Sequence, residues 1–297
     1  MPRLSLLIDV TKCNGCHSCF LACRDEYYNN DHTPYSAPQP LDGQFWMRVT
    51  EVERGSYPKP KLDYIPIPCM QCEKAPCVEV AEDQAVYRRE DGIVLIDPVK
   101  AKGQKAIVNA CPYRVIHWNA ELEIPQKCTM CAHMIDAGER QPRCVEACPT
   151  GALVFGDLDD PSSEIAKLSA VLANEIYHPE YAVAPTVKYV GLPKRFVVGE
   201  VLRRDVPGEC AQGAKIKLEG GGLKLETCSD IYGDFEFDGL EKNVDYFLSV
   251  ELEGYVPMSI EVSTQSDVDL GTIILAPFGR EESIVQSRRD KTRRTRQ

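Results

Sequence analysis

The sequence predicts two domains of different class, an α+β domain built around cysteine-rich loops and an all-β sandwich that follows it. Twelve of the 14 cysteines lie before residue 150. From residue 195 onward, short runs of alternating apolar and polar residues recur about every 8–12 residues, with turn residues between them. The length of 297 residues leaves room for both domains. We therefore expect domains over residues 1–190 and 195–277, with a basic and disordered tail over residues 278–297.

Composition and charge narrow the class of protein. With 43% hydrophobic and 27% charged residues the chain is typical of a soluble globular protein. The net charge of −11 argues against a nucleic-acid partner, because phosphate binding needs a basic face. No apolar run reaches the length of a membrane span, and the N-terminal stretch MPRLSLLIDVTKC lacks the features of a signal peptide. These features predict a cytoplasmic location and no direct membrane span.

The cysteine spacing of the first domain is typical of cubane iron–sulfur ligation. The first four cysteines read C-x2-C-x2-C-x3-C, the run with which bacterial ferredoxins bind their clusters. Zinc and disulfides are the alternatives, but such a run is unusual for structural zinc, and disulfide frameworks belong to short secreted chains. Since four thiolates bind one cubane, twelve cysteines predict three 4Fe-4S clusters. The twelve are Cys13, Cys16, Cys19, Cys23, Cys69, Cys72, Cys77, Cys111, Cys128, Cys131, Cys144 and Cys148.

A rule of two-cluster ferredoxins assigns these cysteines to clusters. The fourth cysteine of a run binds the other cluster, because a helix carries it away from the loop. Cluster one is therefore predicted to bind Cys13, Cys16, Cys19 and Cys148. Cluster two is predicted to bind Cys23, Cys128, Cys131 and Cys144. The remaining cluster three is predicted to bind Cys69, Cys72, Cys77 and Cys111.

Local patterns predict the elements of the first domain. Leu4–Val10 alternates as a short strand does, and residues 18–29 favour a helix. Phe45, Met47 and Val49 alternate with polar neighbours, which predicts a half-buried strand. The remaining expectations are a hairpin over 85–97 around Asp91-Gly92, short helices carrying Cys77, Cys111 and Cys148, and an amphipathic helix over 161–177.

The second domain is predicted from seven strand-like runs. They are FVVGEVL, AKIKLEG, LKLETCS, DFEFDGL, VDYFLSVEL, PMSIEVS and VDLGTIIL. Cys210 and Cys228 lie in this half and are expected to be free thiols, with a disulfide as the alternative if the strands bring them close. Several of these runs resemble the transthyretin-like and carboxypeptidase-regulatory-like domains, notably GAKIKLEG, TCSDIYGDFEFDGL and DLGTIIL. This resemblance implies an immunoglobulin-like sandwich and indicates nothing about chemistry.

The cysteine motifs carry a second resemblance, over about the first 180 residues. The stretches DVTKCNGCHSCFLAC, PCMQCEKAPCVEV, GIVLIDPVKAKGQKAIVNACPY and QKCTMCAHMID are similar to the iron–sulfur subunits of the DMSO reductase family of molybdopterin enzymes. That family usually has sixteen cysteines for four clusters in a bis-ferredoxin-like domain. In its frame, cysteines would stand where this chain has Ala81, Ala101, Gln104 and Ile107. All four ligands of one cluster are therefore replaced together, which supports the pairing and implies three clusters.

Within that family the chain resembles the small subunits of pyrogallol–phloroglucinol transhydroxylase and of resorcinol hydroxylase. The stretches YRREDGIVLIDPVKAKGQK and CPYRVIHWN are especially similar to that group. The resemblance implies a large partner subunit that holds molybdenum or tungsten in molybdopterin and hydroxylates or transhydroxylates phenols anaerobically. This chain would then be a non-catalytic electron-transfer subunit of a heteromer. The alternatives are the iron–sulfur subunit of another respiratory molybdopterin enzyme and a free-standing polyferredoxin.

Some residues near the cysteines have two interpretations. Gly15 and Gly103 are expected where the backbone comes close to a cluster. Four basic residues would raise a cluster potential by their charge, or else are ordinary solvated or packed side chains: Lys12, His17, Lys127 and His133. Three aromatic residues would shield clusters from water, or else simply pack in the core: Trp46, Tyr113 and Trp118.

Overall fold

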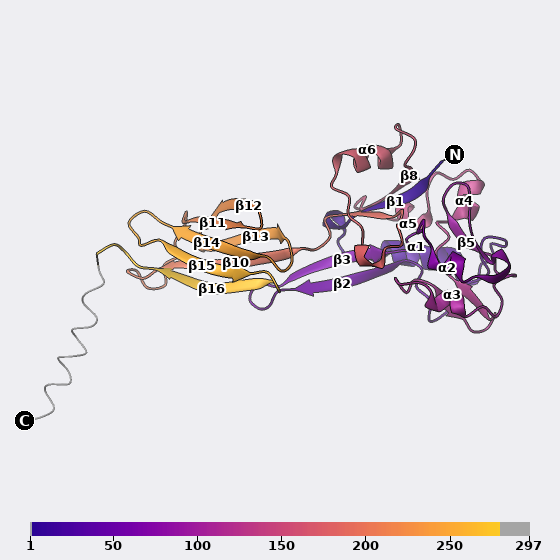
Figure 1. Cartoon of the computed structure of the whole chain (residues 1–297), viewed down its shortest axis with the longest axis horizontal. Helices are drawn as coiled ribbons and strands as arrows, with labels where there is room; N and C mark the ends of the chain where they lie inside the picture. The colour runs from indigo at the N-terminus through magenta and orange to yellow at the C-terminus, as the bar shows by residue number, and fades with distance from the viewer. Residues whose placement is uncertain (1, 280–297) are drawn as a thin grey trace, which may run out of the picture. The chain divides into compact units, whose positions relative to one another are not determined.

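The computed structural model describes residues 2–279, and the chain divides into two compact units (Figure 1). The N-terminal unit comprises Met1–Val52 and Leu62–Leu192, and the C-terminal unit comprises Glu53–Lys61 and Pro193–Gln297. The basic tail predicted over residues 278–297 lies outside the described residues from position 280 onward. Within residues 2–279, no helix is both long enough and apolar enough to cross a membrane.

A small three-stranded sheet forms one part of the N-terminal unit. The central strand β1 (Leu4–Asp9) pairs antiparallel with β8 (Leu153–Asp157) and parallel with β9 (Lys188–Val190). Five of the six residues of β1 are buried, including the polar Ser5 and Asp9, so burial continues along the strand and does not alternate. The pairing brings the two ends of the cysteine-rich region together, because β1 precedes the first cysteine and β8 follows the last.

Short helices and hairpins make up the rest of this unit (Figure 1). Most of them come directly before or after a cysteine loop in the sequence. The α-helices are α1 (Ser18–Tyr27), α2 (Pro76–Glu79), α3 (Ala106–Asn109), α4 (Ala132–Asp136), α5 (Arg143–Glu146) and α6 (Glu164–Val171). The 3-10 turns are η1 (Val10–Lys12), η2 (Glu82–Gln84) and η3 (Pro179–Tyr181). The two-stranded sheets are β2 (Arg48–Arg54) with β3 (Lys61–Ile67), β4 (Val86–Arg88) with β5 (Val94–Ile96), and β6 (His117–Asn119) with β7 (Ile124–Gln126).

Several predicted elements differ in detail from those of the structure. The hairpin over 85–97 is confirmed, and Gly92 has the positive φ of 87° that its turn requires. The helix predicted over 161–177 is shorter, because α6 ends at Val171 and only Ile165 is buried on it. Trp46 and Met47 are buried but precede β2, so the strand predicted from residue 45 starts at Arg48. Cys77 lies on α2, whereas Cys111 and Cys148 follow α3 and α5.

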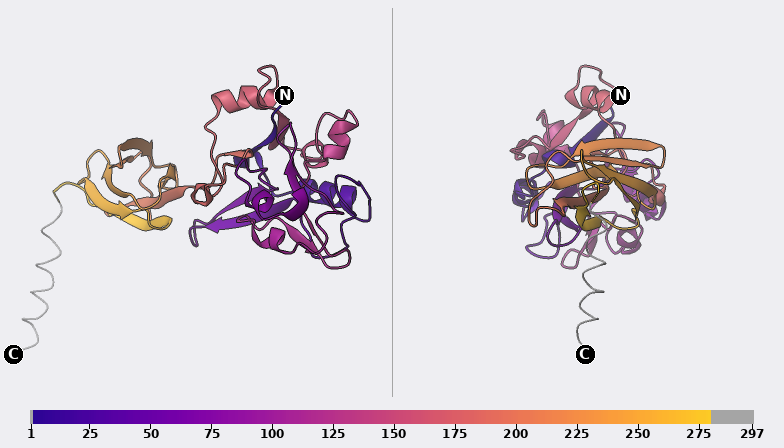
Figure 2. Two further views of the ribbon diagram at one scale, coloured as in Figure 1. Left: turned by 45° about the vertical axis from the view of Figure 1, so that its right-hand side comes forward. Right: turned by 90° about the vertical axis from the view of Figure 1, so that its left-hand side faces the viewer.

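The C-terminal unit is all-β, and all seven predicted strands are present (Figures 1 and 2). One sheet has the order β13-β10-β16 and the other has the order β12-β11-β14-β15. Side chains from both sheets share one buried apolar cluster, which includes Val201, Phe235, Ile216 and Leu248. The strands are β10 (Arg195–Arg203), β11 (Lys215–Gly220), β12 (Leu223–Cys228), β13 (Asp234–Leu240), β14 (Asp245–Glu251), β15 (Met258–Ser263) and β16 (Val268–Leu275).

Residues 53–61, the turn between β2 and β3, belong to the C-terminal unit although they are distant from it in sequence. Lys61 forms ion pairs with Glu236 and Asp238 of β13, at 2.6 Å in the case of Asp238. Gly55 in this turn has a positive φ of 74°, and a Cβ at this position would meet the ring of Phe196 at 2.5 Å. Both observations explain why the turn requires glycine there. Sequence periodicity could not assign this turn, since ion pairs between distant segments leave no local pattern.

Candidate metal centre

The first group of thiols joins the first cysteine loop to the end of the cysteine-rich region. Burial raises the pKa of Cys13, and the charges of Cys148 and Cys16 act in the same direction. Burial raises the pKa of Cys19 to about 12, with further contributions from Cys13, Cys148 and Cys16. The antiparallel pairing of β1 with β8 explains the proximity, because it brings residues that follow β1 beside residues that precede β8.

The second group contains the most deeply buried thiols. Cys23 lies on α1 and Cys144 on α5, two helices that pack against each other. Burial raises the pKa of Cys23 well above its usual range, and the charges of Cys128 and Cys131 add to the effect. Burial likewise raises the pKa of Cys144, and the charges of Cys131, Cys128 and Cys23 act in the same direction. These four thiols come from three separate segments of the sequence.

The third group lies between two apolar clusters of the N-terminal unit. Burial raises the pKa of Cys72 to about 12, and the charges of Cys69, Cys111 and Cys77 contribute. The guanidinium of Arg88 donates hydrogen bonds to the main-chain oxygens of Cys72 and, at 2.9 Å, of Gly92. Arg88 therefore fixes the cysteine loop against the 85–97 hairpin, a role that the sequence patterns did not indicate.

The second group lies between the other two. Cys23 and Cys144 both interact electrostatically with Cys19 of the first group. Cys128 interacts with Cys69 of the third group, and after burial this is the largest influence on its pKa. The three cysteine groups therefore follow one another in the N-terminal unit in the order first, second, third.

The environment of the thiols suits ligands of an iron–sulfur cluster. Main-chain groups hydrogen-bond to the sulfurs, as between Met130 N and Cys128 Sγ at 3.4 Å. Burial opposes ionisation of Cys148, but hydrogen bonds from the Thr150 hydroxyl and nearby main chain lower its pKa nonetheless. Within residues 2–279 no three cysteine sulfurs lie within 4.8 Å of one another. A single zinc ion would require sulfurs about 3.8 Å apart, given a Zn–S bond of about 2.3 Å.

Lys127 supplies an independent indication of a negatively charged group. Its side chain is buried, with an exposed fraction of 2%. Nζ donates to the main-chain oxygens of Val94 and, at 3.1 Å, of Cys128. In the part of the chain that the structure describes, no carboxylate forms an ion pair with this ammonium. A buried charge is costly unless an opposite charge compensates it, and the thiols of Cys77 and Cys128 are the groups that its charge acts on.

Three of the four positions at which the family's cysteine frame expects a cysteine belong to an apolar core. Ala101 and Ile107 are fully buried in one cluster, against which Ala81 also packs. The Gln104 amide binds the main chain of Glu82, accepting from its N–H at 2.9 Å and donating to its oxygen at 3.3 Å. These residues therefore meet in space, and packing and hydrogen bonds fill the place they occupy.

The other residues singled out from the sequence are two basic residues and two glycines near the cysteine loops. Lys12 forms an ion pair with Asp9 at 3.0 Å, and His17 takes a left-handed conformation before α1. Gly15 and Gly103 have φ of 70° and 79°, and the ring of Tyr64 lies where a Cβ on Gly15 would project.

Of the three aromatic residues singled out from the sequence, Tyr113 interacts electrostatically with a cysteine group. The charges of Cys72 and Cys111 contribute, after burial, to raising its pKa. Trp46 packs against Tyr27 with ring centroids 4.5 Å apart, and Lys105 lies over the ring of Trp118 at 5.8 Å. Tyr113 therefore lies beside the third group, Trp46 is a core residue, and Trp118 is a partly exposed one.

Comparison with known proteins places these features in a family. A family described as a 4Fe-4S dicluster domain matches residues 60–158. The chain is 39% identical to the pyrogallol hydroxytransferase small subunit of Pelobacter acidigallici, over 93% of this chain and 100% of that one. It is 36% identical to a subunit of the sulfite dehydrogenase of Allochromatium vinosum, over 66% of this chain and 85% of that one. It is also 36% identical to a subunit of the tetrathionate reductase of Salmonella typhimurium, over 66% of this chain and 75% of that one.

These features define an electron-transfer protein that binds 4Fe-4S clusters. The chain belongs to the family of iron–sulfur subunits of molybdopterin oxidoreductases, as the resemblance of its cysteine motifs predicted.

Proposed function

We propose that this chain is the three-cluster electron-transfer subunit of a heteromeric molybdopterin enzyme that hydroxylates or transhydroxylates phenolic substrates. The observation that carries the proposal is the extent of the match to the pyrogallol hydroxytransferase small subunit. That match covers 93% of this chain and so includes the C-terminal unit. The matches to the sulfite dehydrogenase and tetrathionate reductase subunits cover 66% of it.

The three thiol groups are the proposed cluster ligands, in the pairing predicted from the sequence. Cluster one would be held by Cys13, Cys16, Cys19 and Cys148. Cluster two would be held by Cys23, Cys128, Cys131 and Cys144. Cluster three would be held by Cys69, Cys72, Cys77 and Cys111. When bound, each cluster accepts and releases single electrons, at a potential that charge, hydrogen bonding and solvent exposure set.

The chain's own residues hold and insulate this electron path. The middle position of the second group supports an electron path in the order one, two, three. Burial of most of the thiols in apolar clusters excludes water from them. Main-chain hydrogen bonds to sulfur and the buried ammonium of Lys127 stabilise negative charge at the ligands. The packed residues Ala81, Ala101 and Ile107 support the absence of a fourth cluster.

The remaining parts of the proposal concern the partner and the fold. The large partner subunit would hold molybdopterin with molybdenum or tungsten and carry out the ring chemistry. We propose a bis-ferredoxin-like fold for the N-terminal unit and a carboxypeptidase-regulatory-like, immunoglobulin-like fold for the C-terminal one. The two-sheet architecture and shared core of the C-terminal unit support the latter.

An assay of the complex purified under anaerobic conditions tests this function. We expect the chain to co-purify with a large molybdopterin subunit that converts pyrogallol or resorcinol. Omission of an artificial electron acceptor then separates two reactions, because hydroxylation releases two electrons and transhydroxylation releases none. Conversion of a sulfur oxyanion such as sulfite or tetrathionate, with no activity on phenols, would contradict the proposal. A lone chain in native extract would instead support a free-standing polyferredoxin.

A further inference from the structure

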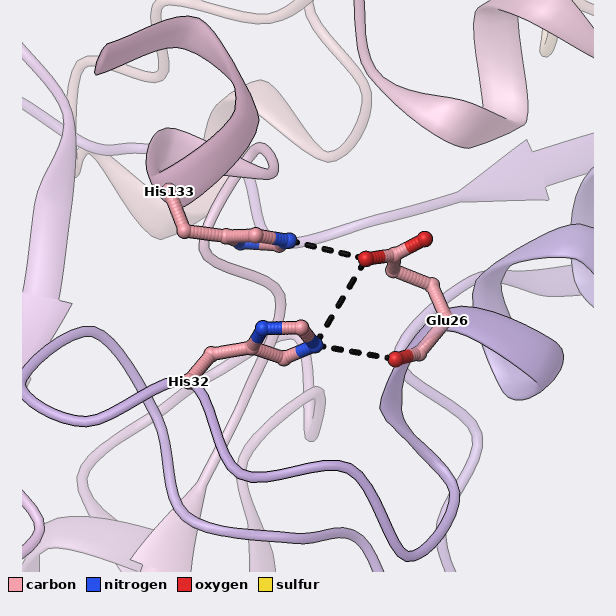
Figure 3. Close-up of side chains that lie close together, drawn as sticks. All are labelled: Glu26, His32 and His133. Carbon is pink, nitrogen blue, oxygen red and sulfur yellow. Dashed lines mark hydrogen bonds and ion pairs between the residues drawn. The ribbon is translucent and has the colours of Figure 1, made fainter. Parts of the chain in front are cut away.

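A second set of metal-ligating side chains lies outside the cysteine groups. Glu26, His32 and His133 bring one carboxylate oxygen and two imidazole nitrogens within 4.8 Å of one another (Figure 3). The residues come from the end of α1, the loop that follows it and helix α4. Because three separate segments supply one ligand each, no spacing in the sequence indicates the set.

The positions of the three ligand atoms suit a single ion. Glu26 Oε1 lies 2.9 Å from His133 Nε2 and 3.5 Å from His32 Nε2. Bonds of about 2.0–2.2 Å in a tetrahedral site place ligand atoms about 3.3–3.5 Å apart. The two imidazole rings, which are stacked with planes 23° apart, would have to rotate for both Nε2 lone pairs to meet one ion. Two histidines with one carboxylate form a ligand set used for zinc and for non-haem iron(II).

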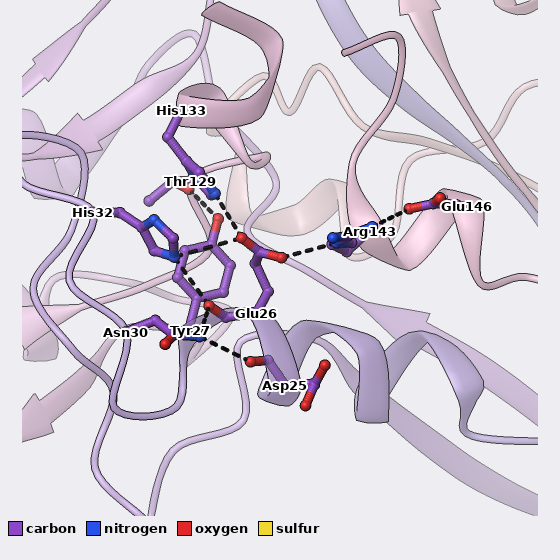
Figure 4. Close-up of polar contacts among 9 residues, drawn as sticks. All are labelled: Asp25, Glu26, Tyr27, Asn30, His32, Thr129, His133, Arg143 and Glu146. Carbon is purple, nitrogen blue, oxygen red and sulfur yellow. Dashed lines mark hydrogen bonds and ion pairs between the residues drawn. The ribbon is translucent and has the colours of Figure 1, made fainter. Parts of the chain in front are cut away.

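Neighbouring residues hold the three side chains in place (Figure 4). The rings of His32 and His133 stack with centroids 3.9 Å apart, and Tyr27 packs its edge against both. Arg143 Nε donates to Glu26 Oε2 at 2.8 Å, which leaves Oε1 directed at the histidines. The three side chains are only 13–18% exposed. These contacts keep the three ligand atoms together in a part of the unit that water still reaches.

Charges of both signs lie near the site. The carboxylate of Glu26 interacts with the thiol of Cys131, so the site lies beside the second cysteine group. Ligated thiolates there would add negative charge and offset the guanidinium of Arg143. His32 also bonds the main-chain oxygen of Glu26 at 3.0 Å, a contact that metal binding would replace.

We propose that Glu26, His32 and His133 form a mononuclear site for a divalent transition-metal ion, Zn²⁺ or Fe²⁺, separate from the iron–sulfur clusters. The ion would join the loop after α1 to helix α4. This loop runs from Tyr28 to Met47 without a helix or a named strand, and loops of that length usually have a function or a constraint of their own. The site does not depend on the substrate of the enzyme.

Metal analysis of the anaerobically purified complex, with its clusters intact, tests the site. The complex is treated with EDTA, incubated with Zn²⁺ alone, desalted, and analysed for zinc and iron. We expect wild type to retain about one zinc per chain and His32→Gln to retain none, with equal iron in both. His178→Gln is the matched control, because His178 also hydrogen-bonds a glutamate, Glu180 at 2.7 Å, but lies outside the set. Equal zinc in wild type and His32→Gln, or none in wild type, would overturn the proposal.

A second measurement keeps the test decisive if His32→Gln loses iron. Crystals of the wild-type complex soaked in Zn²⁺ give an anomalous difference map at the zinc edge. A peak bounded by Glu26, His32 and His133 is the expected result. A map without a peak there would show that the three residues form a hydrogen-bonded network only.

Discussion

At the scale of single residues, one buried cation stands out among the cysteines. Lys127 is 2% exposed and donates only to main-chain oxygens in the described residues. Its charge acts on Cys77 and on Cys128, which belong to the third and second groups. Of the two interpretations of Lys127 that the sequence left open, the structure favours an electrostatic role over a solvated side chain.

Replacement of Lys127 by methionine should lower the midpoint potentials of the neighbouring clusters. A buried positive charge stabilises the reduced cluster, which carries one more negative charge, so its removal favours the oxidised form. Redox titration followed by EPR measures the change. Lys12→Met is the control, because Lys12 is about half exposed and paired with Asp9. A potential that moves equally in both variants would contradict this role.

A glycine near the first group gives a second prediction at this scale. Gly15→Ala should lower the temperature at which cluster absorbance is lost, because its Cβ would collide with the Tyr64 ring at a φ of 70°. Gly103→Ala is the matched control, with φ of 79° and no atom within 4 Å of its Cβ. We expect the control to lose only the backbone contribution of about 1 kcal/mol. Equal losses in both variants would show that the Tyr64 contact contributes nothing.

At the scale of elements, the segment from α2 to α3 is the part in which this chain differs from the family's cysteine frame. Ala101 and Ile107 are fully buried there, and Gln104 holds the turn that follows Ala81. A cluster site and an apolar core are alternative ways to stabilise the same short helices. The structure shows the second, so these residues contribute to folding through packing.

Ile107→Ala should therefore destabilise the N-terminal unit by about 2–5 kcal/mol without removing a ligand. The iron content per chain should stay unchanged at low temperature, while the midpoint of thermal unfolding falls. Val99→Ala is the control, because Val99 is 76% exposed. If Ile107→Ala leaves stability unchanged, the segment is not the packed core described above.

Sequence patterns predicted these elements unevenly. The hairpin over 85–97 and the seven strands of the C-terminal unit follow from local chemistry, namely Asp91-Gly92 and period-two alternation. The extent of α6 did not follow, since Val171 completes an apolar pattern yet lies 78% exposed. The place of residues 53–61 in the C-terminal unit depends on ion pairs of Lys59 and Lys61 with β13, which no local pattern reveals.

The candidate site shows the same division. Cysteine spacing predicted the ligands, because the loops that hold a cluster are local. Arg88 and the Glu26–His32–His133 set were not predicted in these roles, because contacts between distant segments define them. A basic residue near a cysteine was the signal that singled out Lys127 and His133 as charges close to a cluster.

At the scale of the whole molecule, family membership and the proposed cluster count are separate statements. Subunits of other molybdopterin oxidoreductases match 66% of this chain. The match to the pyrogallol hydroxytransferase small subunit extends into the C-terminal unit. The cluster count depends instead on the twelve cysteines and on the packing of the four substituted positions. It determines how many electrons the subunit can store.

Iron and sulfide analysis of the anaerobically purified complex tests the proposed three-cluster electron path most directly. Three cubanes predict about twelve iron atoms and about twelve inorganic sulfides per copy of this chain, after subtraction of any iron in the partner. Mössbauer spectra should contain 4Fe-4S signals, with at most one mononuclear iron per chain beside them if Fe²⁺ occupies the Glu26–His32–His133 site. About sixteen iron atoms per chain, or zinc in place of iron at the cysteines, would contradict the account.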